Sequence, residues 1–467
     1  MTPRRIVRQG RSGRYDGGQE LPEEERMFRR LIRSALFFLF APVLHGQQWD
    51  IGARATDSVA AATENRLRFT FEQRGRYESR TGTNFGTDVD VATGLYRTRL
   101  GAIWTPLKWL RFSGMMQDSR APWYGENAPN TVRDSADLHE AYIELFPGAT
   151  RGFGFTGGRM MLNYGDGRLI GTPQWSNLSR TYDQARLYWR GKGMRLEFLA
   201  VSPVKIRSDE FNRPVPGERV WGTYNTFSDF YRKNLLDLYV LRHEQNRPGG
   251  FTGGVQKDGT DKLATNTFGF RLAGPLAGEV TYTLEAALQK GEVGPAHLSA
   301  AAWAGGLKHR WTLLGRPLDM SAEYKYASGT ANPGDPRHTG TFDQISPANH
   351  DKFGHEDLFG WRNLHDARSL TTFAITKAFA LNFMYNDLWL ACLKDGIYSS
   401  AGKLIARSVT GTAGRHVGRE TDLFATYTYK HFTVGGGYGR VFCGGFLNRT
   451  TPGVGPTYLY IFHTYTL

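Results

Sequence analysis

Polar and apolar side chains alternate with a period of two along residues 65 to 80, NRLRFTFEQRGRYESR. Six of the seven even positions from 66 to 78 are charged, whereas no odd position in that stretch carries a charge. Successive side chains leave a strand on opposite faces, so this pattern predicts a β-strand. Charged side chains opposite large apolar groups are typical of a transmembrane barrel strand, which has water on one side and lipid on the other.

The same alternation recurs along the chain and predicts eighteen strands, an even number as in most bacterial barrels. Neighbouring strands of an antiparallel barrel alternate in direction. The order of short and long connections gives the segments 194–203 and 234–244 the same direction, so one further strand must lie between them. RVWGTYNTF at 219–227 supplies it, since it is rich in aromatic and β-branched residues. The other predicted strands are 65–78, 94–105, 108–118, 137–146, 153–162, 181–190, 194–203, 234–244, 265–273, 279–290, 297–312, 317–328, 367–376, 379–391, 419–430, 432–443 and 457–467.

Short and long connections alternate between these segments, and the longest runs from 329 to 366. Short turns on one side and long loops on the other are the signature of bacterial outer-membrane barrels. No run reaches the roughly 18 to 20 apolar residues that a membrane helix needs. The chain ends on an alternating segment, TYLYIFHTYTL, which would close the sheet, although Leu467 stands where such barrels usually end in Phe. We therefore predict an all-β fold, a transmembrane antiparallel β-barrel of about 18 strands.

Three parts divide the chain. Residues 1–26 are polar and fit neither a signal nor a fold, so we interpret them as a disordered or wrongly assigned N-terminal extension. Residues 27–46, MFRRLIRSALFFLFAPVLHG, have the charged and apolar regions of a secretory signal peptide. Residues 47–467 would form the barrel domain. This organisation predicts the outer membrane of a diderm bacterium, with outer-membrane lipid and the barrel-assembly machinery as partners.

The formal net charge is +14, and 44 of the 58 basic residues are arginine. Arginine suits bidentate recognition of carboxylate or phosphate. The basic residues are scattered over strands without a nucleic-acid motif, so an anionic solute is expected and a nucleic-acid partner is not. Alternation places the following charged residues inside the barrel: Arg66, Arg68, Arg74, Arg76, Arg97, Arg99, Arg111, Arg159, Arg186, Arg195, Arg271 and Arg368, with the acids Glu72, Glu140, Glu144, Glu285, Glu323, Glu420 and Asp422.

Two interpretations of these charges remain open. They could form a ladder that replaces the hydration of a polyanion step by step, as charged rings do in anion pores. They could instead neutralise one another across neighbouring strands. The excess of arginine favours the ladder.

Other chemistry receives little support. The 329–366 loop contains His338, His350, His355 and several acids at spacings that match no strong metal motif, so we expect a solvated loop that folds into the pore. The segment from Tyr164 to Arg168 lacks a phosphate-binding fingerprint and is expected to order an outer loop. No catalytic motif is present. We expect no enzyme activity, no cofactor and no metal.

Five segments together resemble the alginate export family of outer-membrane proteins. They are DLHEAYIEL (137–145), GRMMLNYGDGRLIG (158–171), EYKYASGTANPGD (323–335), GTFDQISPANHDKFGHEDLFGWRN (340–363) and GRETDLFATY (418–427). The resemblance spans residues 65 to 467 and implies an eighteen-stranded barrel whose arginine-rich lumen passes an anionic polysaccharide. One departure concerns the inward turns, which are all short and offer no long periplasmic segment to gate the pore.

The resulting hypothesis is a monomeric outer-membrane channel for export or passage of an alginate-like anionic polysaccharide by passive, charge-selective diffusion. Periplasmic export proteins would be further partners. Two alternatives remain. One is a general porin or uptake channel for small anions. The other, from a different class, is an outer-membrane enzyme or adhesin whose function lies in its loops.

Overall fold

The computed structural model describes residues 53–87, 90–127, 131–208, 210–246 and 262–467. The predicted extension at 1–26 and signal peptide at 27–46 lie outside these residues. Residues 53–62 form a helix ahead of the first strand.

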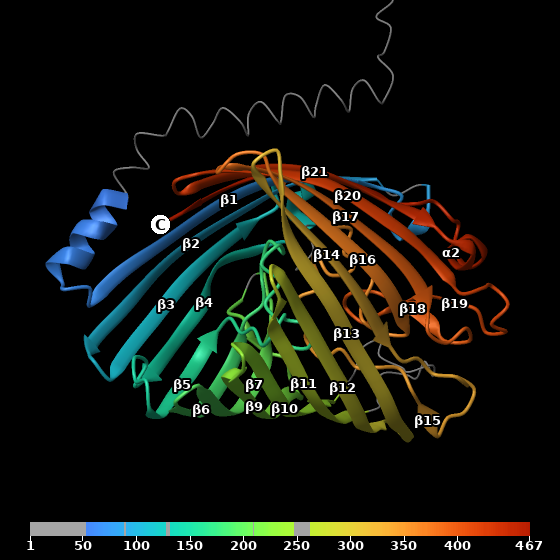
Figure 1. Cartoon of the computed structure of the whole chain (residues 1–467), viewed down its shortest axis with the longest axis horizontal. Coiled ribbons are helices and arrows are strands. Elements are labelled where there is room, and N and C mark those ends of the chain that lie inside the picture. Colours follow the sequence, from blue (N-terminus) through green and yellow to red (C-terminus); the bar gives the residue numbers. More distant parts are fainter. Residues whose placement is uncertain (1–52, 88–89, 128–130, 209, 247–261) are drawn as a thin grey trace, which may run out of the picture. The chain divides into compact units, whose positions relative to one another are not determined.

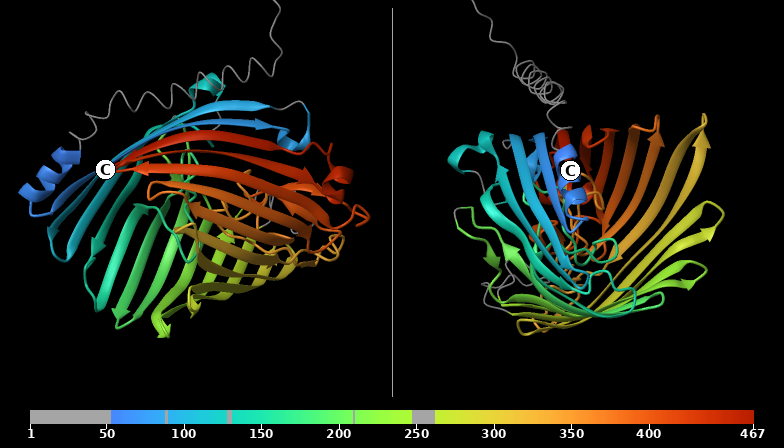
Figure 2. Two further views of the ribbon diagram at one scale, coloured as in Figure 1. Left: turned by 45° about the horizontal axis from the view of Figure 1, so that its top comes forward. Right: turned by 90° about the vertical axis from the view of Figure 1, so that its left-hand side faces the viewer.

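Eighteen long antiparallel strands form one closed barrel (Figures 1 and 2). Each strand pairs with its neighbours in chain order, and the last strand pairs with the first from Glu72 opposite Thr466 to Thr81 opposite Thr457. Closure leaves no unpaired sheet edge, which is the condition for a sheet to cross a bilayer. The predicted fold class is confirmed.

The barrel strands have the following bounds: β1 (Leu67–Thr81), β2 (Val91–Leu107), β3 (Leu110–Arg120), β4 (Asp134–Leu145), β5 (Gly152–Met160), β6 (Tyr182–Gly191), β7 (Met194–Lys205), β9 (Glu218–Tyr231), β10 (Asn234–Gln245), β11 (Leu263–Ala277), β12 (Val280–Val293), β13 (Ala296–Leu313), β14 (Arg316–Ala327), β16 (Leu364–Ala374), β17 (Phe379–Leu390), β20 (His416–Tyr429), β21 (Phe432–Cys443) and β22 (Thr457–Thr466). The strand predicted at 219–227 is present as β9, antiparallel to both β7 and β10.

Short helices and strands lie within the loops. They are η1 (Thr83–Phe85), η2 (Pro122–Asn127), β8 (Arg213–Pro214), β15 (His338–Thr339), β18 (Gly396–Tyr398), β19 (Leu404–Arg407) and α2 (Gly445–Thr450). Within the described residues, no helix is both long enough and apolar enough to cross a membrane.

The two ends of the barrel differ as predicted, with one exception. One end carries only short turns, such as the two-residue turn at Leu314 and Gly315, whose positive φ angles of 52° and 71° match the twist of a tight hairpin. The other end carries the long loops. The exception is the connection of β12 to β13 at 294–295, which lies at the long-loop end but is also a two-residue turn. We call these the short-turn end and the long-loop end.

An apolar belt covers the outer face of the barrel. Phe383 of β17, Leu423 of β20 and Tyr438 of β21 lie side by side in register, and their exposed fractions are 47%, 52% and 46%. Exposed apolar side chains at this density suit contact with lipid acyl chains. The inward positions of the same strands are largely buried and include polar residues such as Glu420 and Asp422.

Replacing Leu423 by Arg should destabilise the folded barrel by about 2–4 kcal/mol, because the charge would lie in the middle of the belt. The measurement is the free energy of unfolding in urea, with the protein folded into lipid vesicles. Arg419→Lys is the matched control, since Arg419 lies on the same outer face near the long-loop end, is already charged and is 56% exposed. Equal stability of the Leu423→Arg variant and the wild type would place this face outside the bilayer.

Candidate functional site

Two long loops fold into the barrel and pair with each other. The first inner loop, residues 161–181, joins β5 to β6, and the second inner loop, residues 328–363, joins β14 to β16. Ile170 and Ser346 form a parallel bridge between them, and the Ser346 N–H donates to the Leu169 carbonyl at 2.8 Å. The prediction that the second loop folds into the pore agrees with this arrangement.

Apolar side chains pack beneath the loops. Phe342, Phe359 and Trp361 of the second inner loop are fully buried in one cluster with Ile170 and inward wall residues such as Leu199. Burial of this apolar surface stabilises the docked loops. The second inner loop is therefore a packed element, which corrects the expectation of a solvated loop.

Four buried arginines on β1 and β2 hold the tip of the first inner loop. We call Arg74, Arg76, Arg97 and Arg99 the arginine clamp. Arg74 donates to the carbonyls of Gln174 at 2.8 Å and Ser176 at 2.9 Å, and Arg97 donates to the same two carbonyls at 3.2 and 2.9 Å. Alternation along β1 and β2 aims these guanidinium groups inward, and the loop backbone supplies their acceptors.

The other two clamp residues extend the contact. Arg76 donates to the Trp175 carbonyl, and its guanidinium lies 4.2 Å from the centre of the Trp175 ring. Arg99 donates to the Gln174 side-chain oxygen at 3.3 Å and to Gln117 of β3 at 2.7 Å. The tip is thus fixed by charge-assisted hydrogen bonds to successive backbone carbonyls.

Positive charge exceeds negative charge within the clamp. Glu72 forms ion pairs with Arg97 at 2.7 Å and Arg99 at 3.7 Å, and Glu78 pairs with Arg76 at 2.5 Å. Among the described residues, Arg74 has no carboxylate within 4 Å, and its buried Nε has no hydrogen-bond acceptor. A buried cation without an ion pair raises the local positive potential.

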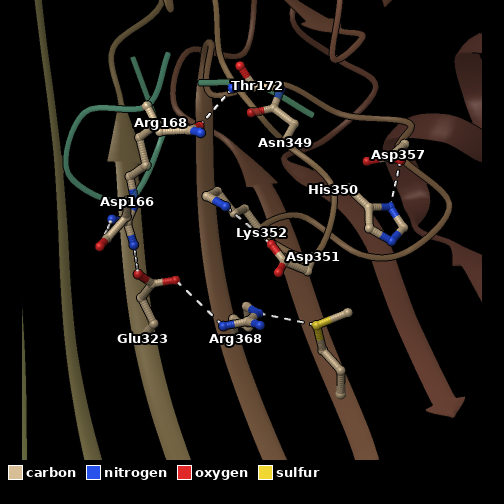
Figure 3. A network of polar contacts seen from close by, with 12 residues as sticks. Asp166, Arg168, Thr172, Glu323, Asn349, His350, Asp351, Lys352, Asp357 and Arg368 are labelled. Atoms are coloured by element: carbon tan, nitrogen blue, oxygen red, sulfur yellow. Dashed lines mark hydrogen bonds and ion pairs between the residues drawn. The ribbon is translucent and has the colours of Figure 1, made fainter. Parts of the chain in front are cut away.

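A second network joins the first inner loop to the opposite wall (Figure 3). Arg168, which is buried, contacts Asp166 at 2.5 Å, Glu285 of β12 at 3.4 Å and Glu323 of β14. Arg271 of β11 reaches Asp166 at 2.7 Å. Burial raises the pKa of Asp166, but Arg168 and Arg271 outweigh burial and hold it below its ordinary value. The segment from Tyr164 to Arg168 therefore orders an inner loop, and it does so through ion pairs.

Carboxylates balance the cations in this second network. Arg271 also approaches Asp237 at 3.4 Å, Arg368 lies 4.0 Å from Glu323, and Lys325 pairs with Asp366 at 2.6 Å. For these residues the interpretation of mutual neutralisation fits, whereas the clamp keeps an excess of arginine.

The remaining predicted residues are spread along the wall. Arg111 pairs with Glu144 at 2.9 Å, and both Arg186 and Arg195 contact Glu197. Glu140 accepts a hydrogen bond from the Met161 N–H at 2.9 Å. Arg66 and Arg68 are exposed near the short-turn end, and Arg66 pairs with Glu64 at 3.1 Å. Glu420 and Asp422 are buried beneath the second inner loop.

Arg159 differs from its expected inward position. The register places it opposite Asp183, on the face that also carries the exposed Phe153 and Trp189, and Arg159 Nε donates to Asp183 at 2.7 Å. The inward positions of β5 include Gly154, where an added Cβ would lie 2.2 Å from the Tyr188 ring. Glycine carries no polarity signal, so alternation in this strand was ambiguous.

Several inward cations were missing from the sequence prediction. Arg80 continues the even-numbered face of β1 and was excluded only because that strand was ended at 78. Lys325 follows the predicted Glu323 by two positions and shares its face. Arg168 and Arg180 lie in the first inner loop, where no periodic pattern exists to reveal them.

A cleft of about 280 Å³ lies beside the clamp, between the two inner loops and the wall. Arg180 links the loops across it, donating to the Pro347 carbonyl at 2.8 Å and the Gly171 carbonyl at 3.3 Å. The lining combines three guanidinium groups with two carboxylates, aromatic rings and amides, and includes Arg76, Glu78, Arg80, Trp175, Arg180, His350 and Asp357. No group of three or more His, Cys, Asp or Glu side chains in the described residues has a geometry suited to a metal.

The model of the family described as alginate export matches residues 65–460, which include both inner loops and all barrel strands except the second part of β22. The chain belongs to the alginate export family. No curated protein matches it. Membership of the alginate export family and the porin-like barrel place the chain in the bacterial outer membrane and support a channel.

Solved structures from Pseudomonas aeruginosa share the fold at low identity. OccD3 (OpdP) has a TM-score of 0.59 at 12% identity, covering 86% of this chain and 91% of that one. OccK8 (OprE) has a TM-score of 0.57 at 10% identity, covering 86% and 98%. OpdK, solved with vanillate, has a TM-score of 0.55 at 11% identity, covering 86% and 98%. This alginate export family chain is therefore built on the same barrel as those outer-membrane proteins.

Proposed function

We propose that the channel passes an anionic polysaccharide by passive, charge-selective diffusion. The observation that carries this proposal is the arginine clamp with the adjoining cleft. There Arg80 and Arg180 join Arg76 beside Arg74, which has no carboxylate within 4 Å in the described part of the chain. A uronate polymer presents one carboxylate per sugar at regular spacing. A series of guanidinium groups can replace the hydration of each carboxylate in turn.

Clamp and cleft arginines contribute differently. The clamp guanidinium groups already donate hydrogen bonds to the first inner loop. They therefore act on a passing anion mainly through their electrostatic field, which the low-dielectric wall focuses into the lumen. Arg180 donates to two carbonyls and has no carboxylate within 4 Å among the described residues. Its remaining N–H groups are suited to direct contact with a carboxylate.

The cleft volume bears on the size of the bound unit. At about 280 Å³ it lies at the lower edge of typical small-molecule sites, so it suits a single sugar unit of a threaded polymer. The carboxylates Glu78 and Asp357 in the same lining would repel a second anionic unit in the same place. Movement of the polymer would then proceed one sugar at a time.

Planar-bilayer recording of purified protein tests the proposal. Under a KCl gradient, the reversal potential should show a preference for anions. Oligomers of a uronic acid should block the current at lower concentration than neutral oligomers of equal length. Cation selectivity would contradict the proposal, and so would equal block by charged and neutral oligomers. Block by single small carboxylates alone would favour the small-anion channel.

A further inference from the structure

Three carboxyl groups meet where the second inner loop contacts β20. Glu356 belongs to the loop, and Glu420 and Asp422 project inward from β20. All three are buried, with exposed fractions of 3%, 0% and 1%. The Glu356 N–H donates to Glu420 Oε1 at 2.9 Å. We call these three groups the carboxyl cluster.

The loop backbone lies directly on the cluster. Gly354 has a φ of +100°, which side-chain-bearing residues rarely adopt, and a Cβ added there would lie 2.0 Å from the Glu420 carboxyl carbon. Residues 354–356 therefore touch Glu420 with no side chain between them. Any repulsion generated within the cluster acts on the docked loop without an intervening layer.

Cations are too few to balance three ionised carboxylates here. Arg80 is the one cation within 4 Å of the cluster among the described residues, at 3.2 Å from Glu356, and it also contacts Glu78. Within the part of the chain that the structure describes, one oxygen of Glu356, one of Glu420 and both of Asp422 are buried without a partner in hydrogen-bond geometry. Unpaired buried carboxylates are strongly disfavoured in their ionised form. The docked loop therefore requires protons on the cluster.

Other charged and titratable groups face the cluster from four elements. His350 of the loop pairs with Asp357 at 2.7 Å, and His355 contacts the Tyr460 hydroxyl of β22 at 3.1 Å. Among the described residues, the groups around the cluster include His350, Asp351, His355 and Asp357 from the loop, Glu78 and Arg80 from β1, Arg368 from β16 and Tyr460 from β22.

We propose that the carboxyl cluster is a proton-dependent latch that keeps the second inner loop docked in the lumen, and that its ionisation releases residues 353–357 and widens the channel. The latch rests on the channel function of the family and does not depend on charge selectivity. A pore that lacked anion preference could still open with pH.

The direction of the pH effect follows from two loop residues. Burial raises the pKa of Glu356 from its ordinary value of 4.5 to about 8. Repulsion by Asp422 also raises this pKa, whereas attraction to Arg80 lowers it. The docked loop thus holds more protons than the released loop between pH 4.5 and 8. The contribution of Glu356 to docking is fully present below this window. It weakens as pH rises through the window, by up to tenfold in the docking equilibrium per pH unit.

His355 opposes this effect at the acidic side of the window. Burial lowers its pKa to about 3, from an ordinary 6.5, so the docked ring is neutral. Below pH 6.5, His355 would bind a proton in the released loop but not in the docked loop. This proton offsets the one that Glu356 holds in the docked loop, so the two contributions to the pH dependence cancel there. Release should therefore rise most steeply between pH 6.5 and 8.

Single-channel recording from pH 5 to 8.5 tests the latch. In the wild type, the ratio of the wide to the narrow conductance state should rise at least tenfold between pH 6.5 and 8. The cluster variant, Glu356→Gln with Glu420→Gln and Asp422→Asn, should hold the narrow state from pH 6.5 to 8.5, because none of the three groups can ionise. Asp319→Asn is the control: Asp319 is a carboxylate of β14 that pairs with Lys308 at 2.9 Å and Arg310 at 2.7 Å, outside the cluster, and its replacement should keep the wild-type profile.

Labelling provides a second measurement that does not depend on current. In a background with Cys392 and Cys443 replaced by serine, maleimide labelling of Phe353→Cys should increase with pH relative to Val409→Cys. Phe353 is buried and Val409 is exposed, so the ratio removes the pH dependence of the thiol itself. Migration of the unheated protein on a gel confirms that each barrel is folded. A wild-type conductance and labelling ratio that stay constant with pH would overturn the latch, and so would an unchanged profile in the cluster variant.

Discussion

Replacing Arg74 and Arg97 by glutamine should lower the anion preference of the channel and raise its conductance. Each guanidinium removed costs a passing anion roughly 1.7 kcal/mol of attraction at about 10 Å and an effective dielectric of 20. That is more than a tenfold change per charge before screening. The two residues also make four hydrogen bonds to the carbonyls of residues 174 and 176, so the loop tip should loosen. Reversal potential and conductance in planar bilayers measure the two effects.

Lys308→Gln with Arg310→Gln is the matched control for this variant. It removes the same charge from β13, but both side chains are more than half exposed and share Asp319 at the short-turn end. Salt screens exposed charges, so the selectivity should change little. An equal shift in reversal potential for the two double variants would show that net charge, rather than the clamp, sets the preference. No shift in either would assign the clamp a purely structural role.

Lys325→Met should destabilise the barrel by about 3–5 kcal/mol, the usual cost of removing one partner of a buried ion pair. Lys325 is fully buried, with Nζ 2.6 Å from Asp366 and 3.2 Å from Glu323, and it donates to the Lys352 carbonyl of the second inner loop. The substitution leaves Asp366 buried without its cation. The free energy of unfolding in urea, measured in lipid vesicles, gives the loss.

Two further variants separate the ion pair from packing. Lys325→Met combined with Asp366→Leu removes both charges and should recover most of the lost stability, because no buried charge stays unpaired. Lys308→Met removes a lysine that is 51% exposed and should cost less than about 1 kcal/mol. A loss in the single variant that the double variant does not recover would assign the effect to the loop contact.

The strands were predictable because each is encoded locally. A period of two with polar residues inward and apolar residues outward follows from water on one side of the wall and lipid on the other. Parity then required β9, whose own pattern is weak. The prediction that Arg159 points inward was wrong because the inward positions of β5 include glycines, which carry no polarity. Alternation therefore did not determine which face of β5 Arg159 occupies.

The lumen itself was decided by tertiary structure. Alternation aimed Arg74, Arg76, Arg97 and Arg99 inward, but three of them donate to backbone carbonyls of residues 174–176. Every residue type carries the same backbone carbonyl, whatever its side chain. No sequence pattern marks such a partner. The meeting of Glu356 with Glu420 likewise joins positions 64 residues apart, and it exists only because the second inner loop turns back into the barrel.

The sequence by itself therefore determined the barrel, its strand number and the sign of the charges on its inner wall, because these depend on local side-chain alternation and strand direction. Only the tertiary structure decided that the first inner loop also enters the lumen, that the clamp holds it and that a cluster of buried carboxyl groups contacts the second inner loop. Those contacts join distant segments through backbone atoms and buried charges. The segments become neighbours only because the barrel closes around them.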